Sequence, residues 1–242
     1  MRIAVVSDIH SNLAALEAVL EAIDGESPDE LWCLGDLVGY GPKPNECCAA
    51  IAGRADVCLA GNHDLAVRGT IDLAEFGGDA AVAARWTREV LAPESQELLD
   101  RLEPEGSAHG VPLYHGSARD PIWEYVLSDE AAQATLALAG SPLVLVGHSH
   151  VALLAVDAGE GVAGGLAEAG TELELAGIRV LLNPGSVGQP RDGDPRAAYL
   201  VLDLDAQRVS FRRVEYDIER TQREMREAGL PDALAARLTL GQ

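Results

Sequence analysis

The stretch Leu31-Trp32-Cys33-Leu34-Gly35-Asp36 decides the fold, because an apolar run that ends abruptly in Gly-Asp predicts a buried strand with a carboxylate at its carboxyl end. Four further apolar runs, which begin at residues 3, 57, 113 and 143, stop in the same way. The polar side chains that follow these runs are Asp8, His10, Asn62, His63, Asp64, His115, His148 and His150. Continuous Val, Ile and Leu runs are typical of strands buried on both faces, and ligands bind outside the carboxyl ends of such strands in open α/β sheets. Five such endings in one chain argue against a chance arrangement.

Composition limits the class of protein. The 242 residues can bury a substantial core, and we expect a single domain over residues 1–242. Eighteen basic residues against 39 acidic ones give a formal net charge of -21, which makes nucleic acid polymers and anionic membranes poor partners. No apolar run approaches the ~20 residues that cross a bilayer, so we expect a cytoplasmic protein. The four cysteines lack a paired C-x-x-C spacing and are interpreted as reduced structural thiols, and the sequence leaves a homo-oligomer open.

The first 150 residues alternate between strand and helix patterns. Ser11 or Asn12 can cap a helix, and a short helix is expected from about residue 45 to residue 51. The further elements expected in this part are two helices in residues 79–102 separated at Pro93, two short strands in 107–114 and a helix over 129–139. This alternation predicts a largely parallel sheet, and residues 1–150 carry all the metal-capable motifs.

The pattern changes after residue 150. Short strands joined by glycine are expected at residues 151–156, 171–175, 178–182, 197–204 and 209–214. Residues 151–215 therefore predict an antiparallel meander that forms a second sheet packed on the first. Residues 183–190 interrupt it with a run of turn formers, and residues 217–240 predict two C-terminal helices broken at Gly229-Leu230-Pro231.

Seven of the side chains at the strand ends form a set that suits metal ions. They are Asp8, His10, Asp36, Asn62, His115, His148 and His150. Carboxylate, imidazole and amide ligands favour Mn, Fe, Zn, Co or Ni. Seven ligands exceed one tetrahedral site but fit two ions about 3.5 to 4 Å apart that share one carboxylate. Two carboxylates opposite two divalent ions leave a formal charge of about +2 before a bridging hydroxide is counted, so the site is expected to select anionic phosphate esters.

These residues resemble the motifs of the calcineurin-like binuclear metallophosphoesterases. The blocks of that family, written D-x-H, G-D, G-N-H-D/E, H and G-H-x-H, occur in order as Asp8/His10, Gly35-Asp36, Gly61-Asn62-His63-Asp64, His115 and Gly147-His148-Ser149-His150. The turn over residues 183–188 also resembles the small bacterial and archaeal branch that includes phosphodiesterases. As a combination the blocks are highly specific.

The resemblance implies a ligand set for each metal. One metal would be held by Asp8, His10, Asp36 and His150, and the other by Asp36, Asn62, His115 and His148, with Asp36 as the bridge. It also implies that His63 is not a ligand but stands over the substrate, where it steadies transition-state charge or protonates the leaving oxygen. The fold implied is an α/β sandwich of two packed mixed β-sheets flanked by helices, in four αββα layers.

One block departs from the protein-phosphatase branch of this family. That branch carries G-D-x-V-D-R-G, whereas residues 35–41 read Gly-Asp-Leu-Val-Gly-Tyr-Gly. The missing Asp and Arg argue against a phosphoprotein phosphatase, and they remove that branch's carboxylate partner of the catalytic histidine. Whether Asp64 takes over that role is left open by the sequence.

Other candidate residues carry weaker signals. His109 lies outside every block and is interpreted as structural. Trp86 and Trp123 are interpreted as buried aromatics, and of the two Trp123 is the better candidate for a substrate cleft. Arg191 and Arg196 flank the turn-rich loop, where contact with phosphate and plain surface exposure are both open.

The favoured hypothesis is a metal-dependent phosphoesterase in which a metal-bridging hydroxide attacks phosphorus directly. Small phosphodiesters are the expected substrates, because their single charge can be met by two metals, Asn62 and His63, beside a cleft bordered by Tyr40. A phosphomonoesterase is one alternative. A non-catalytic metal-binding scaffold is another, although the presence of all seven ligands and His63 favours an enzyme. A nuclease of the repair type shares the metal blocks, but the chain has no basic stripe for DNA.

Overall fold

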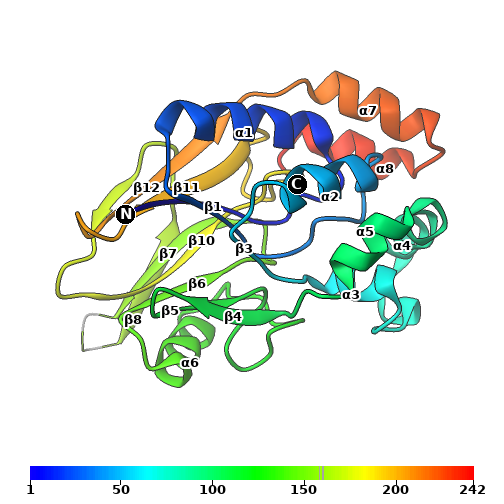
Figure 1. Cartoon of the computed structure of the whole chain (residues 1–242). Coiled ribbons are helices and arrows are strands. Elements are labelled where there is room, and N and C mark those ends of the chain that lie inside the picture. The colour runs from blue at the N-terminus through cyan, green and yellow to red at the C-terminus, as the bar shows by residue number, and fades with distance from the viewer. Residues whose placement is uncertain (158, 160) are drawn as a thin grey trace.

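Two six-stranded mixed sheets pack face to face in the computed structural model, which describes residues 1–242 except 158 and 160 (Figure 1). The first sheet has the order β3-β2-β1-β11-β12-β9, with strands β1 (Arg2–Val6), β2 (Glu30–Cys33), β3 (Val57–Cys58), β9 (Glu172–Glu174), β11 (Ala197–Asp203) and β12 (Arg208–Val214). The second has the order β4-β5-β6-β10-β7-β8, with strands β4 (Glu105–Ala108), β5 (Val111–Tyr114), β6 (Leu143–Val146), β7 (Ala152–Asp157), β8 (Val162–Leu166) and β10 (Arg179–Pro184). The predicted fold class is confirmed.

The prediction that residues 151–215 form the second sheet by themselves is wrong. Strand β1 pairs in parallel with β2 on one side and antiparallel with β11 on the other, so the late strands extend the sheet of the early ones. Strand β10 likewise pairs in parallel with β6 and antiparallel with β7. The physical reason is that an apolar strand such as β1 is stable only in the interior of a sheet, where both of its edges are paired.

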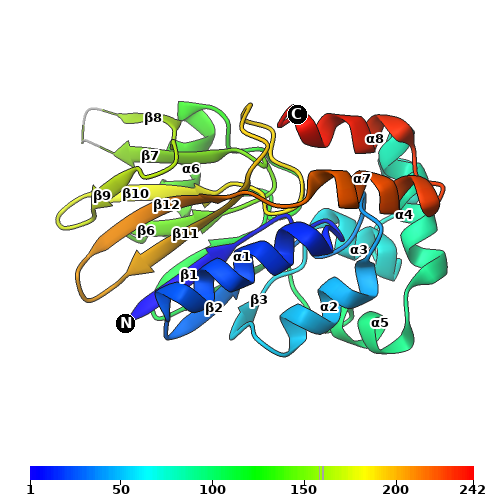
Figure 2. The same ribbon diagram turned by 90° about the horizontal axis from the view of Figure 1, so that it is seen from above.

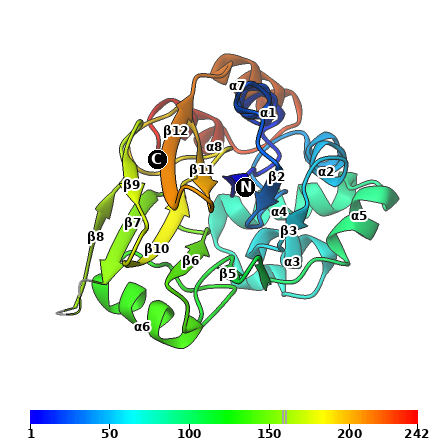
Figure 3. The same ribbon diagram turned by 60° about the vertical axis from the view of Figure 1, so that its left-hand side comes forward.

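The part of the chain that the structure describes forms eight α-helices, which flank the sheets on their outer faces and at one end of the sandwich. They are α1 (Leu13–Glu26), α2 (Pro44–Ala52), α3 (Asn62–Arg68), α4 (Gly78–Val90), α5 (Pro93–Leu99), α6 (Asp129–Ala139), α7 (Ile218–Glu227) and α8 (Asp232–Ala236). Figure 2 shows α1 over the first sheet and α7, which contacts α1, beyond the end of that sheet, and Figure 3 shows α6 against the second sheet. The two helices expected in residues 79–102 and the two expected at the C-terminal end are confirmed.

Side chains of strand β1 alternate between two separate cores. Ile3 and Val5 lie between the two sheets together with Leu145 and Leu182 of the second sheet. Ala4 and Val6 point the other way and join the core beneath helices α1 and α2. A third core packs α6 on the second sheet. Because successive strand side chains point to opposite faces, this alternation produces the four αββα layers.

Helix α3 was not predicted, and it begins inside one of the metal blocks. The Oδ2 atom of Asp64 accepts a hydrogen bond from the Gly61 N–H at 2.9 Å, which satisfies an amide at the start of the helix. Strand β8 was also missed, because its sequence Val-Ala-Gly-Gly-Leu has little strand propensity. Of the described helices, none combines the length and the apolarity that a membrane crossing needs.

Candidate metal centre

The seven predicted ligands meet at one end of the sandwich, beyond the carboxyl ends of β1, β2, β3, β5 and β6. Six of them form two groups in which the ligand atoms lie within 4.8 Å of one another: Asp8, His10, Asp36 and His150, and then Asp36, His115 and His148. Asp36 belongs to both groups. Asn62 joins the second, since its Oδ1 atom lies 3.3 Å from His115 Nε2. All seven residues are at most 4 % exposed.

Each of the four histidines is oriented by a backbone carbonyl. The pairs are His10 Nδ1 with Val38 O (3.0 Å), His150 Nδ1 with Gln189 O (2.6 Å), His115 Nδ1 with Leu34 O (2.8 Å) and His148 Nε2 with Trp123 O (3.2 Å). A carbonyl oxygen only accepts, so the ring nitrogen that faces it carries the hydrogen. The other nitrogen of each ring therefore presents a lone pair to the centre, which is the arrangement that metal-binding histidines need.

The atoms inside the first group fit a cation. His10 Nε2 and His150 Nε2 lie 2.9 Å apart, and both carry lone pairs because both Nδ1 atoms hold the hydrogen. Asp8 Oδ1 and Asp36 Oδ2 are buried without a hydrogen-bond partner among the described residues. Facing lone pairs repel one another, and a buried carboxylate oxygen without a partner is costly. A divalent ion between these atoms would remove both penalties.

Burial shifts the pKa of every ionisable ligand in the direction of its neutral form. It raises the pKa of Asp8 to about 7 and that of Asp36 well above its usual range. It lowers the pKa of His115 to about 3 and that of His148 to about 2, and it lowers those of the other two histidines well below their usual value. The imidazoles are therefore neutral and ready to bind metal near pH 7, whereas the carboxylates need a nearby positive charge to ionise.

The backbone of the centre is strained. Five of the seven ligands have φ in the left-handed region: Asp8 (55°), His10 (49°), Asp36 (55°), His148 (64°) and His150 (59°). Such conformations cost about 1–3 kcal/mol each and gather at functional sites. The residue before Asp36 must be a glycine. At position 35, where φ is 101°, a Cβ would lie 2.6 Å from Gly61 N and 2.9 Å from His115 Nδ1.

Asp64 holds the loops of the centre together. Its carboxylate accepts hydrogen bonds from the backbone N–H groups of Gly61 (2.9 Å), Leu37 (3.2 Å) and Val38 (3.0 Å). These bonds tie the loop after β3 to the loop after β2. His63 Nδ1, in contrast, is buried without a partner in the described part of the chain. The question left open by the sequence is thus answered: Asp64 anchors the backbone and does not orient the His63 ring.

His63 stands beside the two ligand groups in an aromatic cage. Its backbone N–H donates to Asp36 Oδ1 at 2.9 Å. Its ring centroid lies 4.4 Å from that of Tyr40, 4.7 Å from that of Phe76 and 4.9 Å from that of His10. Burial lowers the pKa of His63 to about 3. Tyr40, expected to border a substrate cleft, is 9 % exposed and packs against His63.

Aromatic side chains form the exposed rim of the centre. Tyr125 stacks on His148, with centroids 4.2 Å apart and planes 3° apart, and Trp123 lies 5.4 Å from Phe76. Trp123 and Tyr125 are 37 % and 46 % exposed, so this rim faces solvent. Trp86, the other tryptophan considered for a cleft, packs instead against the cluster formed by the C-terminal helices. Phe76 and Tyr125 were missed, and no periodic pattern in the sequence marks them.

The two candidate arginines have different surroundings. The guanidinium group of Arg196 forms an ion pair with the Asp194 carboxylate at 2.6 Å. Arg191 donates to the Tyr40 hydroxyl at 3.3 Å and to Gln189 Oε1 at 3.2 Å, and its guanidinium carbon lies 5.8 Å from the Tyr40 ring centroid. Of the two, Arg191 is therefore the one next to the centre.

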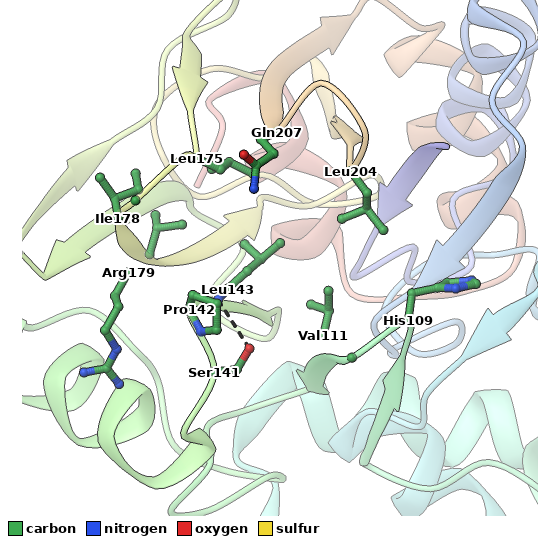
Figure 4. Close-up of a pocket in the computed structure, with 13 residues that line it drawn as sticks. His109, Val111, Ser141, Pro142, Leu143, Leu175, Ile178, Arg179, Leu204 and Gln207 are labelled. Atoms are coloured by element: carbon green, nitrogen blue, oxygen red, sulfur yellow. Dashed lines mark hydrogen bonds between the residues drawn. The ribbon is translucent and has the colours of Figure 1, made fainter.

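A separate cavity of about 450 Å³ lies at the opposite end of the sandwich, where β5, β6 and β10 begin (Figure 4). Its wall is mostly apolar and includes Val111 and Leu143 but none of the candidate ligands. His109 borders this cavity, and its ring bonds to Glu30 at 2.9 Å and stacks on Trp32 with centroids 6.0 Å apart. His109 therefore packs against Trp32, at the end of the sandwich opposite the candidate metal centre.

Comparisons with known proteins agree with this geometry. A family model described as "Calcineurin-like phosphoesterase superfamily domain" matches residues 1–207. A metallophosphoesterase from Sphaerobacter thermophilus superposes with a TM-score of 0.91 at 43% identity, and the match covers 100% of both chains. An uncharacterized protein of Methanocaldococcus jannaschii is 38% identical over an alignment of 245 positions, which covers 99% of this chain and 98% of that one.

A more distant relative has a named activity. The symmetrical bis(5'-nucleosyl)-tetraphosphatase of Delftia acidovorans is 34% identical over 141 residues, which are 56% of this chain. The match spans 48% of the tetraphosphatase, so it covers about half of that enzyme's length.

Metal binding is expected to displace protons from the carboxylates and none from the histidines. At pH 6 Asp8, with a pKa of about 7, is mostly protonated in the metal-free protein, while the histidines are already neutral. The affinity for Mn²⁺ should therefore rise with pH up to and through 7. Calorimetric titration at pH 6 in buffers of different ionisation enthalpy measures the protons released.

The Asp8→Asn variant should release fewer protons per bound ion and bind more weakly. His109→Ala, which changes a titratable group far from the centre, should release the same number as the unaltered protein. Proton release that Asp8→Asn leaves unchanged, or an affinity independent of pH from 5.5 to 8, would contradict this interpretation.

Proposed function

Because the chain belongs to the calcineurin-like phosphoesterase superfamily, we propose that it is a hydrolase of small phosphodiesters that works with two divalent metal ions. One observation carries the proposal: two groups of candidate ligands lie side by side and share Asp36. Asn62 completes the second group. Mn, Fe, Zn, Ni and Co suit this mixture of carboxylate, imidazole and amide donors.

Bound metals would supply positive charge for the phosphate oxygens and would lower the pKa of a water molecule to make it nucleophilic. The residues of the chain balance charge, hold the ligand atoms in position and fix the geometry of the centre. Asp8 and Asp36 balance the charge of the ions, and the carbonyl-bonded histidines hold the lone pairs in position. The left-handed loops and the Asp64 anchor fix these side chains before substrate arrives, so little reorganisation is needed during the reaction.

His63 is the proposed catalytic residue. The Tyr40 and Phe76 rings fix its orientation, and its backbone N–H bonds to Asp36. Its low pKa in the metal-free protein makes it a neutral hydrogen-bond donor, and the negative charge of a bound phosphate would raise that pKa. In this role His63 donates to the leaving oxygen as the phosphorus–oxygen bond breaks.

Charge and space favour a small diester as substrate. The net charge of -21 disfavours long polyanions. The phosphate group of a diester carries a single negative charge, and so does each internal phosphate of a polyphosphate chain, which is also bonded through two bridging oxygens. The activity named for the Delftia relative, on a bis(5'-nucleosyl) tetraphosphate, involves phosphates of this internal type. Asn62, His63 and Tyr40 are the residues proposed to contact the substrate.

Purified protein is expected to hold two transition-metal ions per chain and to lose activity when a chelator removes them. Asp36→Asn should be the most damaging ligand change, because Asp36 belongs to both ligand groups. Elemental analysis, together with an assay on a chromogenic diester, measures both effects. Asp72→Asn alters an exposed carboxylate and is the control. Full activity with one ion per chain under metal excess would rule out the shared-ligand arrangement.

The His63→Ala variant should retain metal but lose kcat by about 10²- to 10⁴-fold, the usual effect of removing a positioned acid or a charge stabiliser. His109→Ala should be nearly silent, because that ring packs against Trp32 away from the centre. Steady-state kinetics with matched metal content tests both variants. An essential His109 together with a dispensable His63 would overturn the assignment of roles.

A comparison of bis(p-nitrophenyl) phosphate with p-nitrophenyl phosphate tests the preference for diesters. With Mn²⁺ bound, kcat/KM is expected to be higher for the diester, since the chain lacks the arginine that follows the G-D block in the protein-phosphatase branch. A higher kcat/KM for the monoester would exclude the diesterase and leave a metal-dependent phosphoesterase.

A further inference from the structure

Two half-buried arginines near the candidate metal centre have no Asp or Glu side chain within 4.0 Å among the described residues, although the chain has 39 acidic residues for 18 basic ones. Of the 18 basic side chains, 12 lie within 4.0 Å of an Asp or Glu carboxylate in the described residues, and Arg191 and Arg237 are among the six that do not. Arg191 Nε is buried with no hydrogen-bond partner. Arg237 donates from Nε to the main-chain O of Gln242, the last residue of the sequence, at 2.7 Å, and the described residues offer its two Nη groups no partner.

The segments that carry these arginines pack against each other. The Gly193 N–H donates to Gly241 O at 3.0 Å, so the turn that begins at Arg237 lies on the turn that follows Arg191. Figure 2 shows the C-terminal end beside the loop that connects β10 and β11. Leu238 lines a small hollow together with His10 and Tyr40 of the centre.

Electrostatic coupling between the two guanidinium groups agrees with this geometry. Burial lowers the pKa of Arg237, and the positive charge of Arg191 lowers it further. Two like charges in a partly dry place repel each other, and no acidic side chain pairs with either one among the described residues. An anion between them would convert the repulsion into attraction, and guanidinium groups bind phosphate oxygens through paired N–H donors.

The arginines lie next to the position expected for a phosphate under attack. The Tyr40 ring centroid is 4.6 Å from that of the candidate ligand His10 and 5.8 Å from the guanidinium carbon of Arg191. One side chain therefore separates the centre from the first arginine, and the turn that begins at Arg237 packs on the turn that follows Arg191. A substrate that binds both at the metal centre and between the two arginines needs two negative groups close together. A chain of linked phosphates provides such groups.

We propose that Arg191 and Arg237 form a second phosphate subsite, which binds the phosphate adjacent to the scissile one in a polyphosphate ester. The proposal rests on the proposed function, because the metal centre must bind the phosphate that is attacked. In the hydrolysis, the oxygen of water bonds to phosphorus and the bridging phosphorus–oxygen bond of the anhydride breaks. One proton of the water stays on the new phosphate hydroxyl, and the other goes to the leaving oxygen of the phosphate held by the arginines.

The test compares a substrate that has one phosphate with a substrate that has several. Bis(p-nitrophenyl) phosphate and diadenosine tetraphosphate are assayed with Mn²⁺ for the unaltered protein, Arg237→Gln and Arg223→Gln. Arg223 is an exposed arginine on α7 and is the control for the loss of one positive charge. Arg237→Gln should lower kcat/KM for the tetraphosphate, relative to kcat/KM for the diester, by about 10- to 100-fold, the effect of one charged hydrogen-bonding group.

Arg223→Gln should leave this ratio unchanged, and Arg237→Lys should restore part of it, because it keeps the charge but loses the paired donors. A ratio that Arg237→Gln leaves unchanged, or that falls equally in both glutamine variants, would overturn the subsite.

A binding measurement separates this proposal from the proposed function. Calorimetric titration of the metal-loaded protein with inorganic diphosphate should give a Kd about 10-fold or more higher for Arg237→Gln than for Arg223→Gln. Hydrolysis of neither ester by the unaltered protein would refute the proposed function, while a weaker affinity for diphosphate in Arg237→Gln would still support the subsite. Equal affinities in the two variants would refute the subsite even in an active diesterase.

Discussion

The burial of two carboxylates, Asp8 and Asp36, is the constraint on which the rest of the structure depends. Each keeps one oxygen without a hydrogen-bond partner in the described interior, where an uncompensated charge is costly. The left-handed backbone at both residues adds strain. The sandwich tolerates this because β1, which leads to Asp8, is paired on both edges, and because Asp64 ties the loop after β2 to helix α3. The metal-free centre is therefore a weak point inside a rigid scaffold, and a bound cation would relieve it.

The residues of the centre could be predicted from the sequence because each lies just after one of five apolar strands, and the end of an apolar run is a local feature. The pairing of the late strands could not be predicted from the sequence. The sheet edge that a late strand joins depends on which edges the earlier strands leave unpaired. Strands β11 and β12 extend the sheet of β1, whereas β10 joins β6, and the alternation of apolar residues is the same in either sheet. The local sequence pattern thus located the candidate site. Which strands belong to which sheet was determined by long-range strand pairing.

The surroundings of His63 show the same limit at the scale of side chains. Asp64 stands three residues after Gly61, a spacing that indicates a capping carboxylate, but its bonds to Leu37 and Val38 join segments 26 and 27 residues apart. Phe76 and Tyr125 reach the centre from loops without any periodic pattern. The orientation of His63 therefore rests on ring packing rather than on a carboxylate, and such packing cannot be recognised in a sequence motif.

The acidic surface and a centre loaded with metal ions would act over different distances. At physiological ionic strength the field of exposed charges falls off over about 8 Å, whereas buried charges are screened much less. A long nucleic acid must place most of its phosphates against the outer surface of a chain with a net charge of -21, where they are repelled. A short ester meets that repulsion only during approach, because all of its phosphates can then lie against the metal centre, Arg191 and Arg237. Under the proposed arrangement, charge therefore selects substrates by length: the surface excludes polymers, and the few cations beside the centre determine how many linked phosphates are bound.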